Sequence, residues 1–503
     1  MMDAAPSLDM GGVAESPAEV RAGRFRQFML DHWLIGALLV AAAVVRVTVM
    51  LAYPPAFWFS DSVAYVHAAV FGRPDLIRPV GYSFLLIMLK PFQSFFLVAV
   101  VQNVMGLAMG AEVYALLRHQ KLPAWASALA ATPPLFSATA LQIEHYVLSD
   151  TFFGFLVTSA LVILLWRPRP RIWVCVLVGL LLAWSVVDRP QGILLMVPFF
   201  LYLATARLGW RRFLVGAITL AATALIPVAA YAWWFDLSYG SFQLTTSTGA
   251  FLYSRVAPFA QCSIVRPPRD EQFLCIDTPV GERHNSSWYV FRPGSPLSRG
   301  SGQRFSSHVN RLAIDFALRT IAAQPATYLR VVWDASVEAF GPAGLGIGTP
   351  SAYQFTDSVP VLTRYELAVR RYDGGVNPST RVIQPFAGWL LTYQRFLRLP
   401  GPLLGLIVAV GLLGIVLGRR RSGSQALVAW LTGAFLIVTP AATADYDARY
   451  VVASVPAFCV AGALGIWEAY LTRRRRRDTE ANSPSLGTPG SGTDDPLGSP
   501  SGG

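Results

Sequence analysis

The chain consists of long apolar segments separated by short polar connections. A bilayer core about 30 Å thick needs about 20 apolar residues per helix, and the sequence offers about ten suitable segments. They lie near residues 33–53, 94–117, 124–143, 151–166, 172–187, 191–206, 213–235, 401–418, 425–441 and 450–471. This pattern predicts an all-α polytopic membrane protein with about ten transmembrane helices.

Basic residues fall on alternate connections. With the N-terminus inside, the cytoplasmic connections hold RHQK (118–121), RPRPR (167–171), RLGWRR (207–212), RRR (419–421) and RRRRR (473–477). Such an excess of arginine and lysine is typical of cytoplasmic loops. We therefore expect both termini to be cytoplasmic, with residues 1–30 as an N-terminal segment without a cleavable signal and 473–503 as a disordered tail.

Residues 236–400 form one long connection on the opposite, extracytoplasmic side, between the seventh and eighth helices. A connection of this length is too long for a passive loop, and apolar residues recur at helical spacing on both sides of Pro325. We expect a mixed extracytoplasmic domain. Cys262 and Cys275 lie 13 positions apart in it, in a polar, proline-rich stretch, and a disulfide is expected if that stretch is outside the cytoplasm.

The membrane part is thereby divided into two modules. Residues 31–235 hold helices 1–7 and include a first extracytoplasmic loop at 54–93, and residues 401–472 hold helices 8–10.

Composition supports membrane insertion and excludes several function classes. The 503 residues are 54% hydrophobic and 14% charged, whereas soluble domains carry about 25% charged residues. The formal charge of +12 is concentrated between apolar segments, which favours membrane lipid over nucleic acid as the partner. There is no phosphate-binding glycine loop, dinucleotide fingerprint, HExxH or CxxC motif, so a nucleotide is not expected as the substrate.

Charged residues gather at the predicted extracytoplasmic ends of the helices, and Arg46 lies within the first helix. The group at the helix ends comprises Asp61, Arg78, Glu144, His145, Asp150, Asp188, Arg189, Asp445, Asp447 and Arg449. Carboxylates can act as bases or bind metal, and arginines bind phosphate oxygens through two parallel bonds. A phosphate leaving group needs no general acid, so one carboxylate base suffices for group transfer from a lipid phosphate, whereas a glycosidase needs two carboxyls.

Several short motifs occur in a characteristic order: VVRVTVMLAYPP, FSDSVAYV, RPVGYSFLLIMLKPF, LQIEHYVLSDTFFGFL, VDRPQGILLMVP and DARYVVASVPAF. In this order the chain resembles the polytopic GT-C glycosyltransferases that use polyprenyl-phosphate sugars. That group includes the protein O-mannosyltransferases and the lipid A aminoarabinose transferase. The resemblance covers roughly residues 30–235 and 400–470.

The resemblance implies roles for individual residues. Asp61 corresponds to the catalytic base, which would take the proton of an acceptor hydroxyl and give inversion at the anomeric carbon. Arg78 and Arg189 would bind the donor phosphate. Glu144 and Asp150, joined by His145, would orient the acceptor or hold a divalent metal, and supporting roles are expected for Arg46, Tyr65 and Arg449. Because Asp61 is followed by Ser62, the first loop alone does not offer a two-carboxylate metal site.

The expected partners are a polyprenyl-phosphate sugar donor, with a mannosyl, arabinosyl or related sugar, and a hydroxyl acceptor on a glycan, lipid or protein. No cofactor is certain and a divalent metal is possible. The protein is expected in the cell membrane with an extracytoplasmic site. Two alternatives stay open: a transporter or flippase for a lipid-linked sugar, and a noncatalytic membrane subunit of envelope-glycan assembly. A transporter should show broken helices meeting near the midplane and internal repeats, and no repeat is evident.

Overall fold

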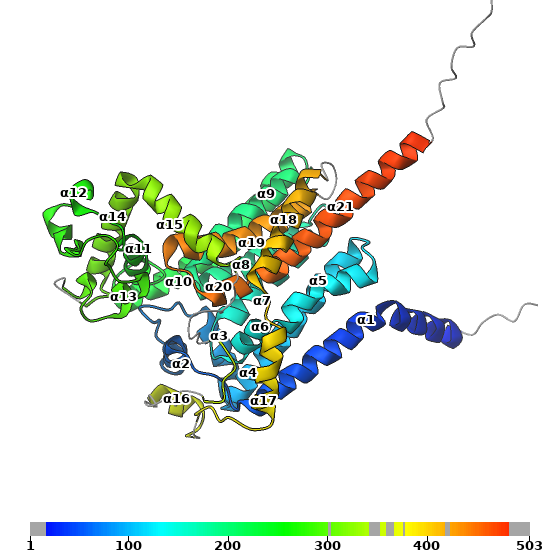
Figure 1. Cartoon of the computed structure of the whole chain (residues 1–503), viewed down its shortest axis with the longest axis horizontal. Helices are drawn as coiled ribbons and strands as arrows, with labels where there is room; N and C mark the ends of the chain where they lie inside the picture. Colours follow the sequence, from blue (N-terminus) through cyan, green and yellow to red (C-terminus); the bar gives the residue numbers. More distant parts are fainter. Residues whose placement is uncertain are drawn as a thin grey trace, which may run out of the picture.

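The computed structural model describes residues 17–299, 303–341, 353–358, 367–375, 378–417 and 423–481. This part of the chain is helical and contains no named strand; its single β-bridge joins Phe57 and Tyr146. Figure 1 shows a helix bundle with the insert at one end, while the start of α1 and the end of α21 lie at the other. The predicted helical fold is confirmed.

Five segments are long and apolar enough to cross a membrane. They are Asp31–Ala52 of α1 (Pro17–Ala52), α4 (Phe95–His119), α10 (Trp210–Tyr239), Ser424–Thr443 of α19 (Gly423–Thr443), and Ala448–Arg474, which covers α20 (Ala448–Val452) and much of α21 (Val455–Ala481). A sixth is possible if α17 (Phe386–Phe396) and α18 (Gly401–Leu417), which are bent by 49°, form one span.

The other predicted spans are helices too short to pass the same test. They are α7 (Asp150–Leu165), α8 (Ile172–Asp188), and the pair η2 (Pro190–Leu195) and α9 (Met196–Thr205). The predicted span 124–143 is divided at Ser137 into α5 (Ala124–Phe136) and α6 (Ala138–His145). Pro133 and Pro134 lie just before this break, where missing N–H donors weaken the helix. A count of ten spans therefore stays a prediction.

The first predicted extracytoplasmic loop is itself structured. It contains α2 (Ser60–Phe71), α3 (Gly81–Leu89) and η1 (Lys90–Phe92). Tyr65 and Val66 of α2 and Tyr82 of α3 are buried in an apolar cluster with the ends of α1 and α4. This packing fixes α2 against the bundle and sets the position of Asp61 in its first turn.

The insert is helical in its described part, where the sequence predicted a mixed domain. It comprises α11 (Thr248–Val256), α12 (Cys262–Val265), η3 (Arg269–Leu274), α13 (Ser286–Phe291), η4 (Pro296–Ser298), α14 (Ser307–Ala323), α15 (Pro325–Glu338) and α16 (Leu367–Tyr372). Tyr253 and Phe316 belong to a separate small core between α11 and α14. The predicted disulfide between Cys262 and Cys275 is present, with the two Cα atoms 6.0 Å apart.

Polar contacts dock the insert onto the bundle at the end of α19. Arg255 of α11 forms an ion pair of 3.4 Å with Asp445, and the Tyr328 hydroxyl of α15 donates to the Ala442 carbonyl at 3.0 Å. Ser247 Oγ donates to the Ile77 carbonyl at 3.0 Å. The insert is thereby attached to the same loop that carries Arg78.

Candidate active site

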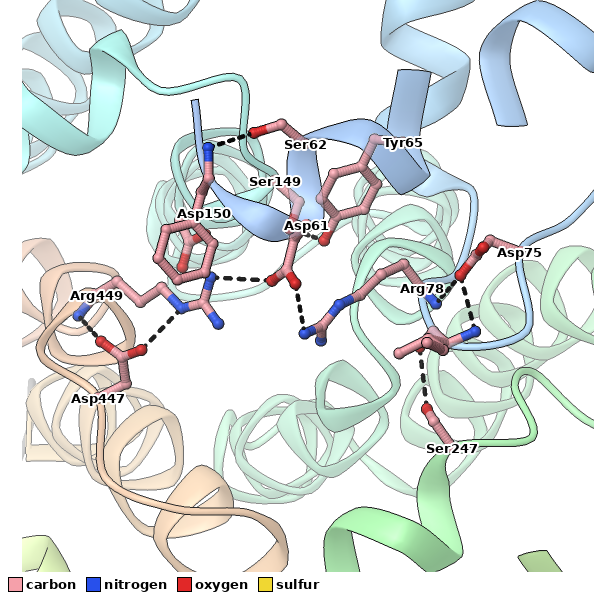
Figure 2. Close-up of polar contacts among 12 residues, drawn as sticks. Asp61, Ser62, Tyr65, Asp75, Arg78, Ser149, Asp150, Ser247, Asp447 and Arg449 are labelled. Atoms are coloured by element: carbon pink, nitrogen blue, oxygen red, sulfur yellow. Dashed lines mark hydrogen bonds and ion pairs between the residues drawn. The ribbon is translucent and has the colours of Figure 1, made fainter. Parts of the chain in front are cut away.

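Asp61 is the centre of a polar cluster at the insert end of the bundle. It lies in the first turn of α2, where a helix N-terminus favours a carboxylate, and only 8% of the residue is exposed. Arg78 donates to one carboxylate oxygen at 2.9 Å and Arg449 to the other at 3.2 Å. Figure 2 shows the carboxylate held between the two guanidinium groups.

The loop between α2 and α3 holds Arg78 in place. Asp75 accepts the backbone N–H groups of Ile77 and Arg78 at 2.8 Å each, a turn stabilised by a side chain (Figure 2). The guanidinium of Arg78 also lies over the Phe251 ring of α11, 5.4 Å from its centre. The insert therefore contributes directly to the orientation of this arginine.

Arg449 is held from the opposite side by α20 and by the insert. Asp447 caps α20 by accepting the Arg449 N–H at 3.2 Å, and its other oxygen forms an ion pair with Arg449 Nε, also at 3.2 Å. Tyr353 donates its hydroxyl to that same oxygen at 3.2 Å. The Phe59 ring covers the guanidinium at 4.9 Å, so three elements position one buried arginine.

A second polar group adjoins the first. Arg189, which follows α8, forms an ion pair of 2.6 Å with Asp150 at the start of α7. Its Nε donates to Ser149 Oγ at 3.1 Å, and the Tyr65 hydroxyl is 3.0 Å from the same oxygen. The groups meet at Tyr450, whose ring lies 5.3 Å from the Arg189 guanidinium and 5.0 Å from that of Arg449.

A narrow cavity joins the two groups and continues into apolar surroundings. Asp150, Arg189 and Arg449 line its polar end, and the apolar wall includes Leu195 and Leu436. Its volume is about 10 Å³, roughly the space of one water. A ligand larger than a water can therefore enter only if the side chains that line the cavity separate.

The two arginines decide the charge of Asp61. Burial alone raises its pKa, but Arg78 and Arg449 outweigh burial and hold the pKa of Asp61 below its ordinary value. Burial raises the pKa of Tyr65 to about 12, so this hydroxyl stays protonated and can donate to Ser149. The cluster thus contains an ionised carboxylate and a neutral phenol.

Sequence reasoning placed Glu144 and His145 beside Asp61, but their recorded contacts lie elsewhere. Glu144 forms two hydrogen bonds of 2.8 Å with Arg46, and both residues are almost fully buried. His145 Nε2 is 2.7 Å from the Tyr53 carbonyl, and burial lowers the pKa of His145 to about 4. In this structure both residues tie α6 to α1, and their predicted acceptor or metal roles stay predictions.

The structure brings together Asp61, Arg78, Asp150, Arg189, Tyr65 and Arg449, and their roles stay predictions. It adds Ser149, Tyr353, Phe251 and Tyr450. Ser149 and Tyr450 could have been suspected, because each is next to a predicted site residue. Tyr353 and Phe251 carry no sequence signal, because the insert brings them to the site through long-range packing.

In the described ranges, no group of three or more His, Cys, Asp or Glu side chains is placed to hold a metal ion. The carboxylates of the cluster are instead paired with arginines.

Neither a family model nor a curated protein matches this chain. Solved structures that it resembles include the oligosaccharyltransferase AglB of Archaeoglobus fulgidus in complex with an inhibitory peptide and a dolichol-phosphate. The sequence identity is 13% and the TM-score 0.43, and the match covers 93% of this chain and 53% of AglB. Another is ArnT of Cupriavidus metallidurans bound to undecaprenyl phosphate, at 14% identity and a TM-score of 0.33, over 89% and 79% of the two chains. This chain thus spans about half the length of the archaeal enzyme.

Both structures come from the GT-C group whose motifs the sequence resembles. With TM-scores below 0.5 the correspondence is loose. The function is therefore argued from the residues of the site.

Proposed function

We propose that the protein is a membrane glycosyltransferase that moves a sugar from a polyprenyl-phosphate donor to an acceptor hydroxyl on the extracytoplasmic face. The observation that carries this proposal is the buried Asp61 carboxylate held by Arg78 and Arg449 beside a cavity with an apolar wall. A base, a cationic phosphate site and an apolar wall are the three features that such a reaction requires.

The donor would bind with its phosphate at the arginines and its isoprenoid chain along the apolar wall. Arg189 and Arg449 line the polar end of the cavity, and Leu195, Phe435 and Leu436 continue it between η2 and α19. Guanidinium groups bind phosphate oxygens through paired, charge-assisted bonds. Each well-placed donor stabilises the charge on the leaving phosphate by a few kcal/mol.

The chemical step is a single displacement. The acceptor oxygen forms a bond to the anomeric carbon as the bond from that carbon to the phosphate oxygen breaks. The electron pair of the broken bond leaves with the phosphate, and the acceptor proton moves to Asp61. Attack opposite the leaving group inverts the anomeric centre.

Asp61 is a weak base while both arginines hold it, because they lower its pKa. A donor phosphate competes for the same guanidinium groups. When Arg78 and Arg449 turn from the carboxylate to the phosphate, Asp61 loses their stabilisation while it stays buried, and its basicity rises. Donor binding would thereby open the narrow cavity and activate the base in one event.

The test is transfer of a radiolabelled sugar from a polyprenyl-phosphate donor in membranes that contain the full chain. Asp61→Asn keeps the shape of the side chain but cannot accept the proton, and we expect transfer to fall by at least about 100-fold. Asp277→Asn, an exposed aspartate of the insert, is the matched control and should retain full transfer. Undiminished transfer by Asp61→Asn would exclude Asp61 as the base.

The reaction product distinguishes a glycosyltransferase from a transporter. It would move the lipid-linked sugar across the bilayer without forming a glycosylated acceptor. Comparison of lipid-linked glycans and envelope polymers between a deletion strain and its parent would then name the sugar and the acceptor.

A further inference from the structure

A second and larger cavity lies away from the Asp61 cluster. It has a volume of about 1090 Å³ and is lined by α5, α18 and α21, which are labelled in Figure 1. We call it the α5–α21 groove. It shares no lining residue with the cavity at Arg189 and Arg449.

The groove is apolar along most of its length. Leu129 of α5 and Leu406 of α18 form opposite walls and are 64% and 58% exposed, while Gly462 and Ala463 of α21 leave space at the base. Helix α5 has 13 residues and rises about 20 Å, longer than the roughly 15 Å of half a bilayer core. A single long isoprenoid chain suits this length better than the acyl chains of one leaflet.

Two arginines line the groove, Arg398 and Arg474, and the end with Arg398, called its polar end here, also holds the buried Ser137. Ser137 is 6% exposed, and its hydroxyl has no hydrogen-bond partner among the described residues. A backbone bond of 2.9 Å from the Ala138 N–H to the Leu397 carbonyl brings Arg398 next to it, and both Ser137 and Arg398 line the groove. The recorded hydrogen bond of Arg398 is long, at 3.4 Å to Gln394. An unpartnered hydroxyl beside a weakly bound guanidinium suits a phosphate group.

The position of this polar end distinguishes it from the donor site. In the donor, the reacting carbon is bonded to the phosphate, so the donor phosphate must lie beside Asp61. Ser137 is separated from the Asp61 side by α6, whose eight residues rise about 12 Å before the chain reaches Ser149 and Asp150. A lipid phosphate at Ser137 can therefore present only a group further along its glycan to Asp61.

We propose that the α5–α21 groove binds the isoprenoid chain of a polyprenyl-phosphate-linked glycan, with its phosphate at Ser137 and Arg398. The assignment of this lipid as the acceptor rests on the glycosyltransferase function proposed above. Donor and acceptor lipids then enter through different cavities.

The binding test uses photoreactive undecaprenyl phosphate with the purified full chain and peptide mapping of the attached label. Peptides from α5, α18 and α21 should be labelled in addition to those near Phe435 and Leu436. Arg398→Ala removes the phosphate contact, and Ala463→Trp fills the groove. Each should lower the labelling of the α5, α18 and α21 peptides by about tenfold, corresponding to about 1.4 kcal/mol.

Arg395→Ala and Ala217→Trp are the matched controls, because neither residue lines either cavity, and both should label like the unaltered chain. A photoreactive phosphatidylglycerol probe tests the competing occupant. Equal labelling of the groove by that probe, labelling confined to the Phe435 and Leu436 region, or unchanged labelling of both groove variants would overturn the proposal.

The outcome is separable from the proposed function. Asp61→Asn should lose sugar transfer and keep the groove labelling. If the unaltered chain transfers no sugar but the groove is labelled, the glycosyltransferase function fails and the lipid site stands. If Ala463→Trp loses labelling but still forms an organic-extractable glycosylated lipid at the normal rate, the acceptor role fails.

Discussion

The ion pair between Arg46 and Glu144 provides the sharpest test of the structure. Arg46 donates to both Glu144 oxygens at 2.8 Å, and a third bond of 2.9 Å goes to the Leu135 carbonyl. The two side chains are 1% and 3% exposed. Gly106 of α4 leaves the space for the carboxylate, since a Cβ there would collide with it.

Removing one partner leaves the other charged and unpaired. Glu144→Leu should cost about 3–5 kcal/mol of stability, the usual loss when half of a buried ion pair is removed. That is a large part of the roughly 5–15 kcal/mol that stabilises a folded protein. The double variant Arg46→Met with Glu144→Leu has an apolar pair in the same volume and should return to within about 1 kcal/mol of the unaltered chain.

The assay is unfolding of the purified protein in detergent, together with sugar transfer. Glu282→Leu, at an exposed position of the insert, is the control and should change stability by less than about 0.5 kcal/mol. The reasoning is refuted if Glu144→Leu is as stable as the control or if the double variant is as unstable as the single one. A stable double variant with normal transfer would also remove Glu144 from acceptor binding, whereas a stable but inactive one would support the role implied by the resemblance.

Three further predictions concern the site and the insert. Tyr353→Phe removes the hydrogen bond to Asp447, so Arg449 is less well oriented. We expect kcat to fall about tenfold with little change in the KM for the donor. Steady-state kinetics measure both constants, and a change in KM alone would contradict the prediction. Because the two arginines hold the pKa of Asp61 below its ordinary value, the acid limb of kcat/KM should lie below the usual titration range of an aspartate. The acid limb of kcat, which reports the bound complex, should lie at a higher pH. Coincident limbs would refute the proposal that Arg78 and Arg449 turn from Asp61 to the donor phosphate. Cys262→Ser opens the 13-residue loop to Cys275 and should destabilise the insert by up to about 3 kcal/mol, measured by proteolysis, with full protection as the contrary result.

The sequence predicted the helical fold, because the fold class depends on composition along the chain. Apolar segments form helices, and Asp61, Arg78, Asp150 and Arg189 follow or precede them at one predicted boundary. The partners of these charges could not be read in the same way. Arg449 reaches Asp61 across 388 positions, a contact that only the tertiary fold decides.

The contacts of Glu144 could not be predicted from its sequence neighbours either. Its position next to His145 and close to Asp150 suggested a common site. The chain turns between α6 and α7, so Glu144 faces α1 and α4 while Asp150 faces Arg189. Neighbouring positions in sequence then belong to different polar groups, and a pattern of residue types cannot separate them.

The charge balance of the cluster favours a proton acceptor inside the site. Three guanidinium groups pair with three carboxylates before any substrate binds: Arg78, Arg189 and Arg449 with Asp61, Asp150 and Asp447. A donor phosphodiester adds one negative charge, and its product phosphate carries a second. If the acceptor proton moves to Asp61, the carboxylate loses its charge as the phosphate gains one, and the net charge of the buried site does not change during transfer. Moving a negative charge from one buried group to another near the same cations costs less free energy than creating an additional charge in a buried site. Asp61 is therefore favoured over bulk water as the proton acceptor.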